Sequence, residues 1–159
     1  MGNQAKVFDT KEIMPVYREL IKNGKEVSLP ITGHSMEPFL KEGRDRVILT
    51  DCKGAFLKRG DIALFMREDG KYIMHRVVKK EGGNYFFAGD EQTFIEGPIK
   101  HSCVVALVKE AYRKGKRITC KNFTWWFFKY IWLLILPMRR GILKFLNRTI
   151  YGSCENEEG

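Results

Sequence analysis

Short runs of apolar, β-branched and aromatic residues dominate the chain between residues 26 and 112. Glycines and charged residues separate these runs, which is the pattern of strands joined by turns. Because no helical pattern intervenes, the segments predict a mainly β, compact antiparallel fold. The predicted strands are 27–32, 46–50, 61–66, 72–78, 84–89 and 103–112.

The residues before this region have a different pattern, because their apolar positions recur at helical spacing. These positions are Ile13, Val16, Tyr17 and Leu20. They predict a short amphipathic helix, which begins after Asp9, where Asp9 and Glu12 resemble a capping box, or alternatively near Pro15, because proline disfavours a helix interior. The predicted organisation is an N-terminal helical segment over 1–25, a β domain over 26–118 and a tail over 119–159.

The tail contains the most hydrophobic segment of the chain. Residues 123–138, FTWWFFKYIWLLILPM, include every tryptophan and a single charged residue, Lys129. As a helix this segment is too short for the ~30 Å hydrocarbon core of a bilayer. Aromatic residues at its start and basic residues on both sides favour an interfacial or re-entrant membrane anchor. A hydrophobic helix packed on the β domain is the alternative.

Most of the net charge of +9 comes from the residues after Ala111, since every charged residue between Tyr112 and Ile150 is basic. Such residues fit anionic lipid or phosphate, and the apolar run between them favours lipid. The sequence therefore predicts that residues 121–150 bind membrane lipid and that nucleic acid is not a partner. Basic flanks also favour the cytoplasmic face of a membrane.

The cysteines and the N-terminal residues limit the choice of compartment. The four cysteines form no CxxC pair, so neither a zinc site nor a dense disulfide framework is expected, and no cofactor is predicted. Free thiols agree with the cytosolic side. The first residues, MGNQAKVFDTKEIMPVYREL, lack the apolar core of a secretory signal. We therefore expect a membrane-associated protein on the cytoplasmic face.

The clearest candidate for chemistry is the segment TGHSMEPFL, residues 32–40. Ser35 lies between Gly33 and Pro38 at the exit from a predicted strand, where the backbone can turn and present the hydroxyl. A serine nucleophile needs a base within hydrogen-bond reach and donors for the oxyanion. His75 is a candidate base, because it lies in the otherwise apolar strand segment YIMHRVV.

Four sequence boxes occur in a fixed order: GHSMEP (33–38), GDIALF (60–65), IMHRVV (73–78) and AGDEQ (88–92). Together they resemble the boxes of type I signal peptidases, a superfamily that includes the LexA-like self-cleaving repressors. The resemblance covers roughly residues 26–112 and implies a signal-peptidase/LexA-like β fold with serine endopeptidase activity. Histidine at the base position is similar to the endoplasmic-reticulum and archaeal branch.

The resemblance also implies roles for single residues. Ser35 matches the nucleophile, His75 the general base and Asp90 the acid that orients the base. Two positions are unusual: Glu91 stands where the family usually has asparagine, and Glu96 lies where this branch often has a second aspartate. The backbone amide of Ser35 is expected among the oxyanion donors.

The implied partner is a precursor or leader peptide, bound in extended form and cut after a small residue such as alanine. Shallow apolar pockets near Met36, Pro38 and Phe39 are expected to bind it, with Met36 packing beneath the site. Asp61 is expected to hold a turn, and His34 is a second choice for the base.

Two alternatives to a processing peptidase remain open. One is a LexA-like regulatory domain that cleaves itself, although no helix-turn-helix precedes the domain. The only Ala-Gly pair, Ala88–Gly89, also follows Ser35 instead of preceding it. The other is a non-enzymatic membrane-binding module that keeps the fold.

Overall fold

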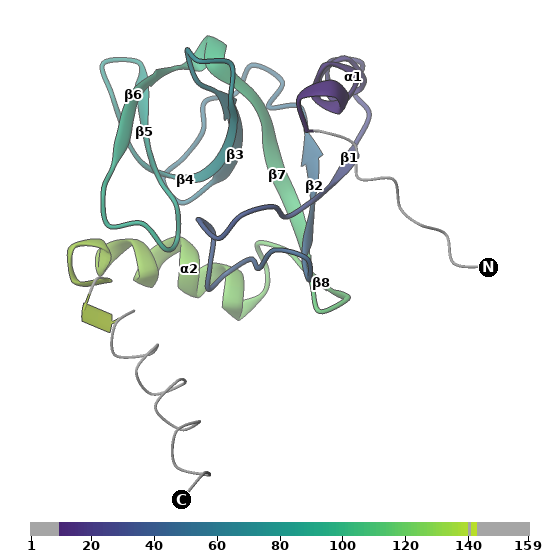
Figure 1. Ribbon diagram of the computed structural model, residues 1–159. Coiled ribbons are helices and arrows are strands. Elements are labelled where there is room, and N and C mark those ends of the chain that lie inside the picture. Colours follow the sequence, from purple (N-terminus) through teal and green to yellow (C-terminus); the bar gives the residue numbers. More distant parts are fainter. Residues whose placement is uncertain (1–9, 140, 143–159) are drawn as a thin grey trace, which may run out of the picture.

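The computed structural model describes residues 10–139 and 141–142, and its centre is an antiparallel eight-stranded sheet (Figure 1). The strands are β1 (Val27–Pro30), β2 (Arg46–Thr50), β3 (Ile62–Met66), β4 (Tyr72–Glu81), β5 (Asn84–Ala88), β6 (Glu96–Lys100), β7 (Val104–Arg113) and β8 (Lys116–Ile118). The described residues thus confirm the predicted mainly β, antiparallel fold.

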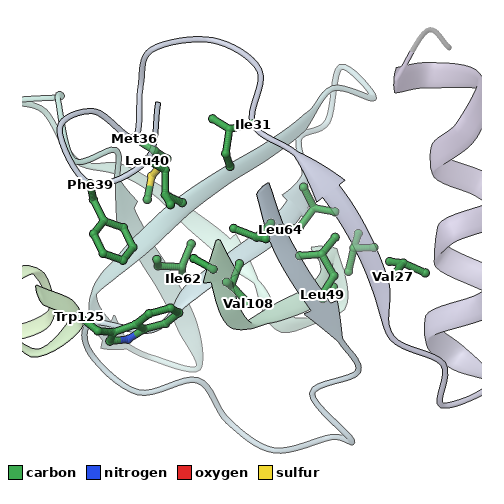
Figure 2. Packing of buried hydrophobic residues seen from close by; sticks show 14 of the residues in the cluster. Val27, Ile31, Met36, Phe39, Leu40, Leu49, Ile62, Leu64, Val108 and Trp125 are labelled. Atoms are coloured by element: carbon green, nitrogen blue, oxygen red, sulfur yellow. The ribbon is translucent and has the colours of Figure 1, made fainter. Parts of the chain in front are cut away.

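The strand order is β1-β2-β7-β3-β4-β5-β6, and β8 pairs with β7. Alternate residues of a strand face opposite sides, so β3 contributes to two separate cores. Ile62 and Leu64 pack into the larger core with Met36 and Phe39 (Figure 2). The smaller core holds Ala63, Phe65, Val77, Tyr85 and Phe87.

Two short strands were not predicted from the sequence. Strand β6 has the sequence EGPIK, in which Gly97 and Pro98 hide the strand pattern, yet it pairs with β5 through Tyr85 and Ile99. Strand β8 is only three residues long and extends a hairpin from β7. Both strands depend on pairing with a neighbour more than on their own composition.

Helix α1 (Thr10–Lys22) forms before the sheet and begins at Thr10, where the capping box predicts it, and not at the alternative start near Pro15. Pro15 lies inside the helix on its exposed side. Met14 and Ile21 lie fully buried in the larger core, and their packing stabilises the helix despite the missing donor at Pro15.

Helix α2 (Phe123–Leu134) lies across one end of the sheet, and a short 3₁₀ turn, η2 (Leu136–Met138), follows it (Figure 1). Its buried residues are Trp125, Phe128, Trp132 and Leu133. The ring centroid of Phe39 lies 5.6 Å from that of Trp125 and 4.9 Å from that of Phe128. The inner side of α2 therefore packs on the β domain, as the alternative interpretation of this segment predicts.

The helix shares the core of the β domain, although the sequence analysis assigned it to a separate tail. Neither of the described helices has the length and apolar character needed to cross a membrane. Residues 1–9, and residue 140 and residues 143–150 of the predicted lipid-binding segment, lie outside the described residues.

Candidate functional site

Ser35 lies in a turn between β1 and β2 and is half-buried. Gly33 precedes it with φ +74°, a conformation that side chains other than glycine disfavour. Two backbone bonds close the turn: Glu37 N–H donates to His34 O at 2.8 Å, and Leu40 N–H donates to Met36 O at 2.8 Å. The local sequence thus fixes the backbone around the serine.

The residues expected to bind substrate differ in accessibility. Met36 is 2% exposed and Phe39 has no exposed surface, whereas Pro38 is exposed. The Phe39 ring also lies 5.0 Å from the guanidinium carbon of Arg76. Met36 and Phe39 therefore support the Ser35 turn from inside the core, and of the three residues only Pro38 lies at the surface.

The loop formed by residues 89–92 follows β5 and contacts the Ser35 turn. Glu91 N–H donates a hydrogen bond of 3.0 Å to Ser35 O. A Cβ atom on Gly89 would lie 2.3 Å from Ser35 O, so only glycine fits against the serine backbone. The structure thus brings the serine box and the Asp90 box into direct contact.

Asp90 forms a fully buried ion pair with Arg76 of β4. Arg76 Nε donates to Asp90 Oδ1 at 2.9 Å, and Arg76 Nη2 donates to Asp90 Oδ2 at 2.7 Å. Arg76 Nη1 also donates to Gly60 O at 3.0 Å, from the GDIALF box. Because both carboxylate oxygens are held in this two-point contact, Asp90 anchors the 89–92 loop to β4.

Two side chains from the C-terminal part bind the same loop. Trp132 Nε1 donates to Asp90 O at 2.8 Å, and Arg139 Nη1 donates to Gly89 O at 3.0 Å. Arg139 Nη2 donates back to Trp132 O at 2.8 Å. Burial lowers the pKa of Arg139 to about 10, and the guanidinium stays charged at neutral pH.

His75 lies on β4 opposite Ala63 of β3 and is only 2% exposed. Its Nδ1 has no hydrogen-bond partner, and the nearest carboxylate oxygen, Glu96 Oε2, is 3.6 Å away. Burial lowers the pKa of His75 to about 4, although the charge of Glu96 opposes this shift. The imidazole is therefore neutral at pH 7, and its contact with Glu96 is not an ion pair there.

Glu96 occupies the place beside His75 where we expected Asp90. It is the first residue of β6, and its carboxylate accepts a 2.6 Å hydrogen bond from Arg67 Nη2 and another from Arg67 Nε. The resemblance to the signal-peptidase boxes implied only that Glu96 lies where this branch often has a second aspartate. The hydrogen bonds of the described residues include none between the Ser35 hydroxyl and His75.

Sequence reasoning did not single out the two buried arginines. The sequence does contain one indication for Arg76, because an arginine inside an apolar strand needs a buried partner. Arg139 gave none, since it follows Pro137 in a basic stretch that reads as a solvated flank.

The other histidines and Asp61 have local partners. His34 is exposed, and its Nδ1 lies 3.0 Å from Glu37 Oε1, a hydrogen bond that raises the pKa of the imidazole. His101 Nδ1 lies 3.1 Å from the Tyr85 hydroxyl. Asp61 Oδ2 accepts a 2.8 Å bond from Lys58 N–H and so holds the turn before β3, as expected.

Within the described residues, no group of three His, Cys, Asp or Glu side chains is placed to hold a metal ion. Cys52, Cys103 and Cys120 are free thiols, and Cys154 lies outside the described residues. In comparisons with models of protein families and with curated proteins, nothing matches this chain.

Proposed function

We propose that the chain is a serine endopeptidase of the signal-peptidase type, with a signal-peptidase/LexA-like fold, Ser35 as nucleophile and His75 as general base. The observation that carries the proposal is the buried, neutral His75 with the Glu96 carboxylate 3.6 Å from its Nδ1. An imidazole with a carboxylate on one nitrogen is the arrangement that supports a base, because the acid stabilises the imidazolium formed during reaction.

The position of Ser35 supports its assignment as nucleophile. The carbonyl oxygen of Ser35 lies against Gly89 and accepts a hydrogen bond from Glu91 N–H. Ala88, the residue before Gly89, pairs with Arg76, which follows His75 in β4. The Ser35 turn therefore contacts the loop that follows β5, and β5 pairs with the strand that carries His75. Hydrogen bonds between nucleophile and base are often long before substrate binds and shorten in the complex.

In the proposed reaction, Ser35 Oγ attacks the scissile carbonyl as its proton passes to His75 Nε2, since Nδ1 faces Glu96. The backbone amide of Ser35 is one donor to the oxyanion. The imidazolium then protonates the leaving amine, and a water molecule hydrolyses the acyl-enzyme through the same base. Each step uses only groups of this chain, the substrate peptide and water.

The sheet supports an extended peptide as substrate. Two of its edge strands are β1, which leads into the Ser35 turn, and β6, which begins at Glu96. An extended peptide binds such an edge through main-chain hydrogen bonds. We propose a precursor or leader peptide with a small residue before the cut.

The test is cleavage of an extended-peptide library, enriched in alanine before the scissile bond and analysed by mass spectrometry. Ser35→Ala should lower kcat by a factor on the order of 10⁴ or more without changing the melting temperature. Ser102→Ala, at an exposed serine, is the matched control. Cleavage at the wild-type rate by Ser35→Ala would refute the assignment, and cleavage confined to the chain itself would favour the self-cleaving alternative.

A further inference from the structure

The outer side of α2 and η2 carries a stripe of exposed apolar side chains, here called the α2 stripe. Successive members are three or four residues apart, so they lie along one side of the helix. Aromatic rings within it are in contact, with centroids 5.8 Å apart for Phe123 and Trp126 and 5.8 Å apart for Trp126 and Tyr130. The members are Phe123, Trp126, Tyr130, Leu134 and Met138, and their exposed fractions range from 45% to 75%.

A basic cavity of about 400 Å³ adjoins the first turn of this helix. Asn122 and Thr124, on either side of Phe123 in the sequence, form part of its wall, so the cavity and the α2 stripe meet. Its basic lining residues are Arg44, Arg113, Lys114, Lys116 and Arg117.

Several of these basic groups lack an acidic partner. Arg44 pairs with Asp45 and Arg117 with Glu110. Within the described residues Lys114 and Lys116 form no salt bridge, and Arg113 Nε is buried without a hydrogen-bond partner. The cavity therefore has an excess of positive charge and an unused donor, which suits an anionic group with several oxygen atoms.

We propose that the α2 stripe and the basic cavity together dock the protein on a bilayer that contains anionic phospholipid. Tryptophan and tyrosine side chains are favoured at the boundary between headgroups and acyl chains. The inner side of α2 is fixed to the β domain by Trp125, Phe128 and Trp132, so the helix lies flat while the stripe inserts. The cavity receives the headgroup phosphate at the end of the stripe.

Charge argues for lipid over a second copy of the chain. A two-fold contact between copies places the same patch of each molecule against the other. From Arg113 to Met138 there is no Asp or Glu, so two basic cavities would meet without compensation. An anionic membrane surface supplies that compensation, and each nearby Lys or Arg strengthens the attraction.

The test is cosedimentation of the full chain with two kinds of vesicle: phosphatidylcholine alone, and phosphatidylcholine with phosphatidylglycerol in equal parts. We expect strong binding only to the mixed vesicles, weakened by added salt. Trp126→Ser with Leu134→Ser should lower the partition coefficient about tenfold, because inserted apolar surface is lost. Lys114→Gln with Lys116→Gln should lower it by a similar factor, about tenfold.

Matched controls are Lys22→Gln with Lys25→Gln, two exposed charges near the end of α1, and Phe56→Ser, an exposed aromatic residue outside the stripe. Both should bind as the wild type does. Equal binding by the stripe variant, or no binding of the full chain to mixed vesicles, would overturn the proposal. So would lipid-free self-association that the stripe variant abolishes, or stabilisation by inorganic phosphate without vesicle binding.

Discussion

His75 and Arg76 are neighbours on β4, and each faces a carboxylate, but the two pairs are built differently. Arg76 and Asp90 are both fully buried and share two short hydrogen bonds. His75 and Glu96 are 3.6 Å apart, and the Nδ1 atom of His75 has no partner. The comparison teaches that the first, saturated pair, with all its hydrogen bonds made, holds a loop, whereas the second, unsaturated pair leaves the His75 Nδ1 atom without a hydrogen-bond partner.

The largest expected effect comes from breaking the saturated pair. Asp90→Ala should lower the free energy of unfolding by about 3–5 kcal/mol, because it leaves the Arg76 charge buried and unpaired. Urea unfolding at pH 7 measures this loss. Glu81→Ala, which breaks an exposed pair with Lys79, should change stability by less than about 1 kcal/mol.

A double replacement sharpens this result. Asp90→Leu combined with Arg76→Met removes both charges, and hydrophobic replacement of a buried pair often costs little. We expect the double variant to be more stable than Asp90→Ala. If it is no more stable, the loss in Asp90→Ala comes from the loop contacts and not from the stranded arginine.

The second prediction concerns pH and the unsaturated pair. The pKa of His75 is about 4 in the folded protein, below the ~6.5 of an unfolded histidine. Below about pH 6.5 the unfolded chain therefore binds the proton first, and stability falls as the pH drops toward 4, by up to about 3 kcal/mol. Urea unfolding at several pH values should show a smaller loss for His75→Gln.

His34→Gln is the control for that experiment, because the pKa of exposed His34 is raised and its contribution has the opposite sign. If His75 is the base of the proposed peptidase, the same low pKa places the acidic limb of its pH–rate profile near pH 4. If the activity instead falls with an apparent pKa near the ~6.5 of an ordinary histidine, His75 is more solvated than its burial indicates.

The third prediction tests whether Glu96, and not Asp90, is the acid that acts on His75 in the proposed reaction. Glu96→Gln should lower kcat about ten- to hundredfold, or about 1.4–2.8 kcal/mol, because the imidazolium loses its carboxylate. The acidic limb should also move to lower pH, since the charge of Glu96 raises the pKa of His75. Glu68→Gln, at an exposed position, should change neither. A lower kcat with an unmoved limb would indicate a purely structural role for Glu96.

The smallest expected effect concerns the helix that supports the saturated pair. Trp132→Phe keeps an aromatic ring but removes the hydrogen bond from Nε1 to Asp90 O. We expect a loss of about 1 kcal/mol in thermal or urea unfolding. Trp126→Phe, on the exposed side of α2, should change stability by less than about 0.5 kcal/mol. Equal losses would mean that the contact with Asp90 O contributes nothing specific.

The sequence predicts the parts of the fold that depend on local pattern. Strands with continuous apolar or alternating residues, such as β3 and β4, lie where the pattern places them. Strand β6 was missed because Gly97 and Pro98 obscure it and its pairing with β5 decides its structure. The inner and outer sides of α2 could not be separated either, because both are apolar and only contacts such as Phe39 with Trp125 distinguish them.

The candidate site was predictable only in part. The sequence boxes point to Ser35, His75 and Asp90, and their segments do lie close together through the 89–92 loop and β4. Which acid faces the imidazole depends on the register of β6 against β5, which places Glu96 opposite Phe87. No local pattern encodes that register.

The contacts of Trp132 and Arg139 with the 89–92 loop have a consequence for the order of synthesis. A nascent chain that has emerged only as far as β8 already carries Ser35, His75 and Asp90, but it lacks the donors that hold Gly89 O and Asp90 O. A domain generally folds as a unit, so its last contacts form only after the residues that make them have been synthesised. The 89–92 loop, which contacts the Ser35 turn, is therefore completed late in synthesis, and a chain truncated before Trp132 lacks the donors to Gly89 O and Asp90 O.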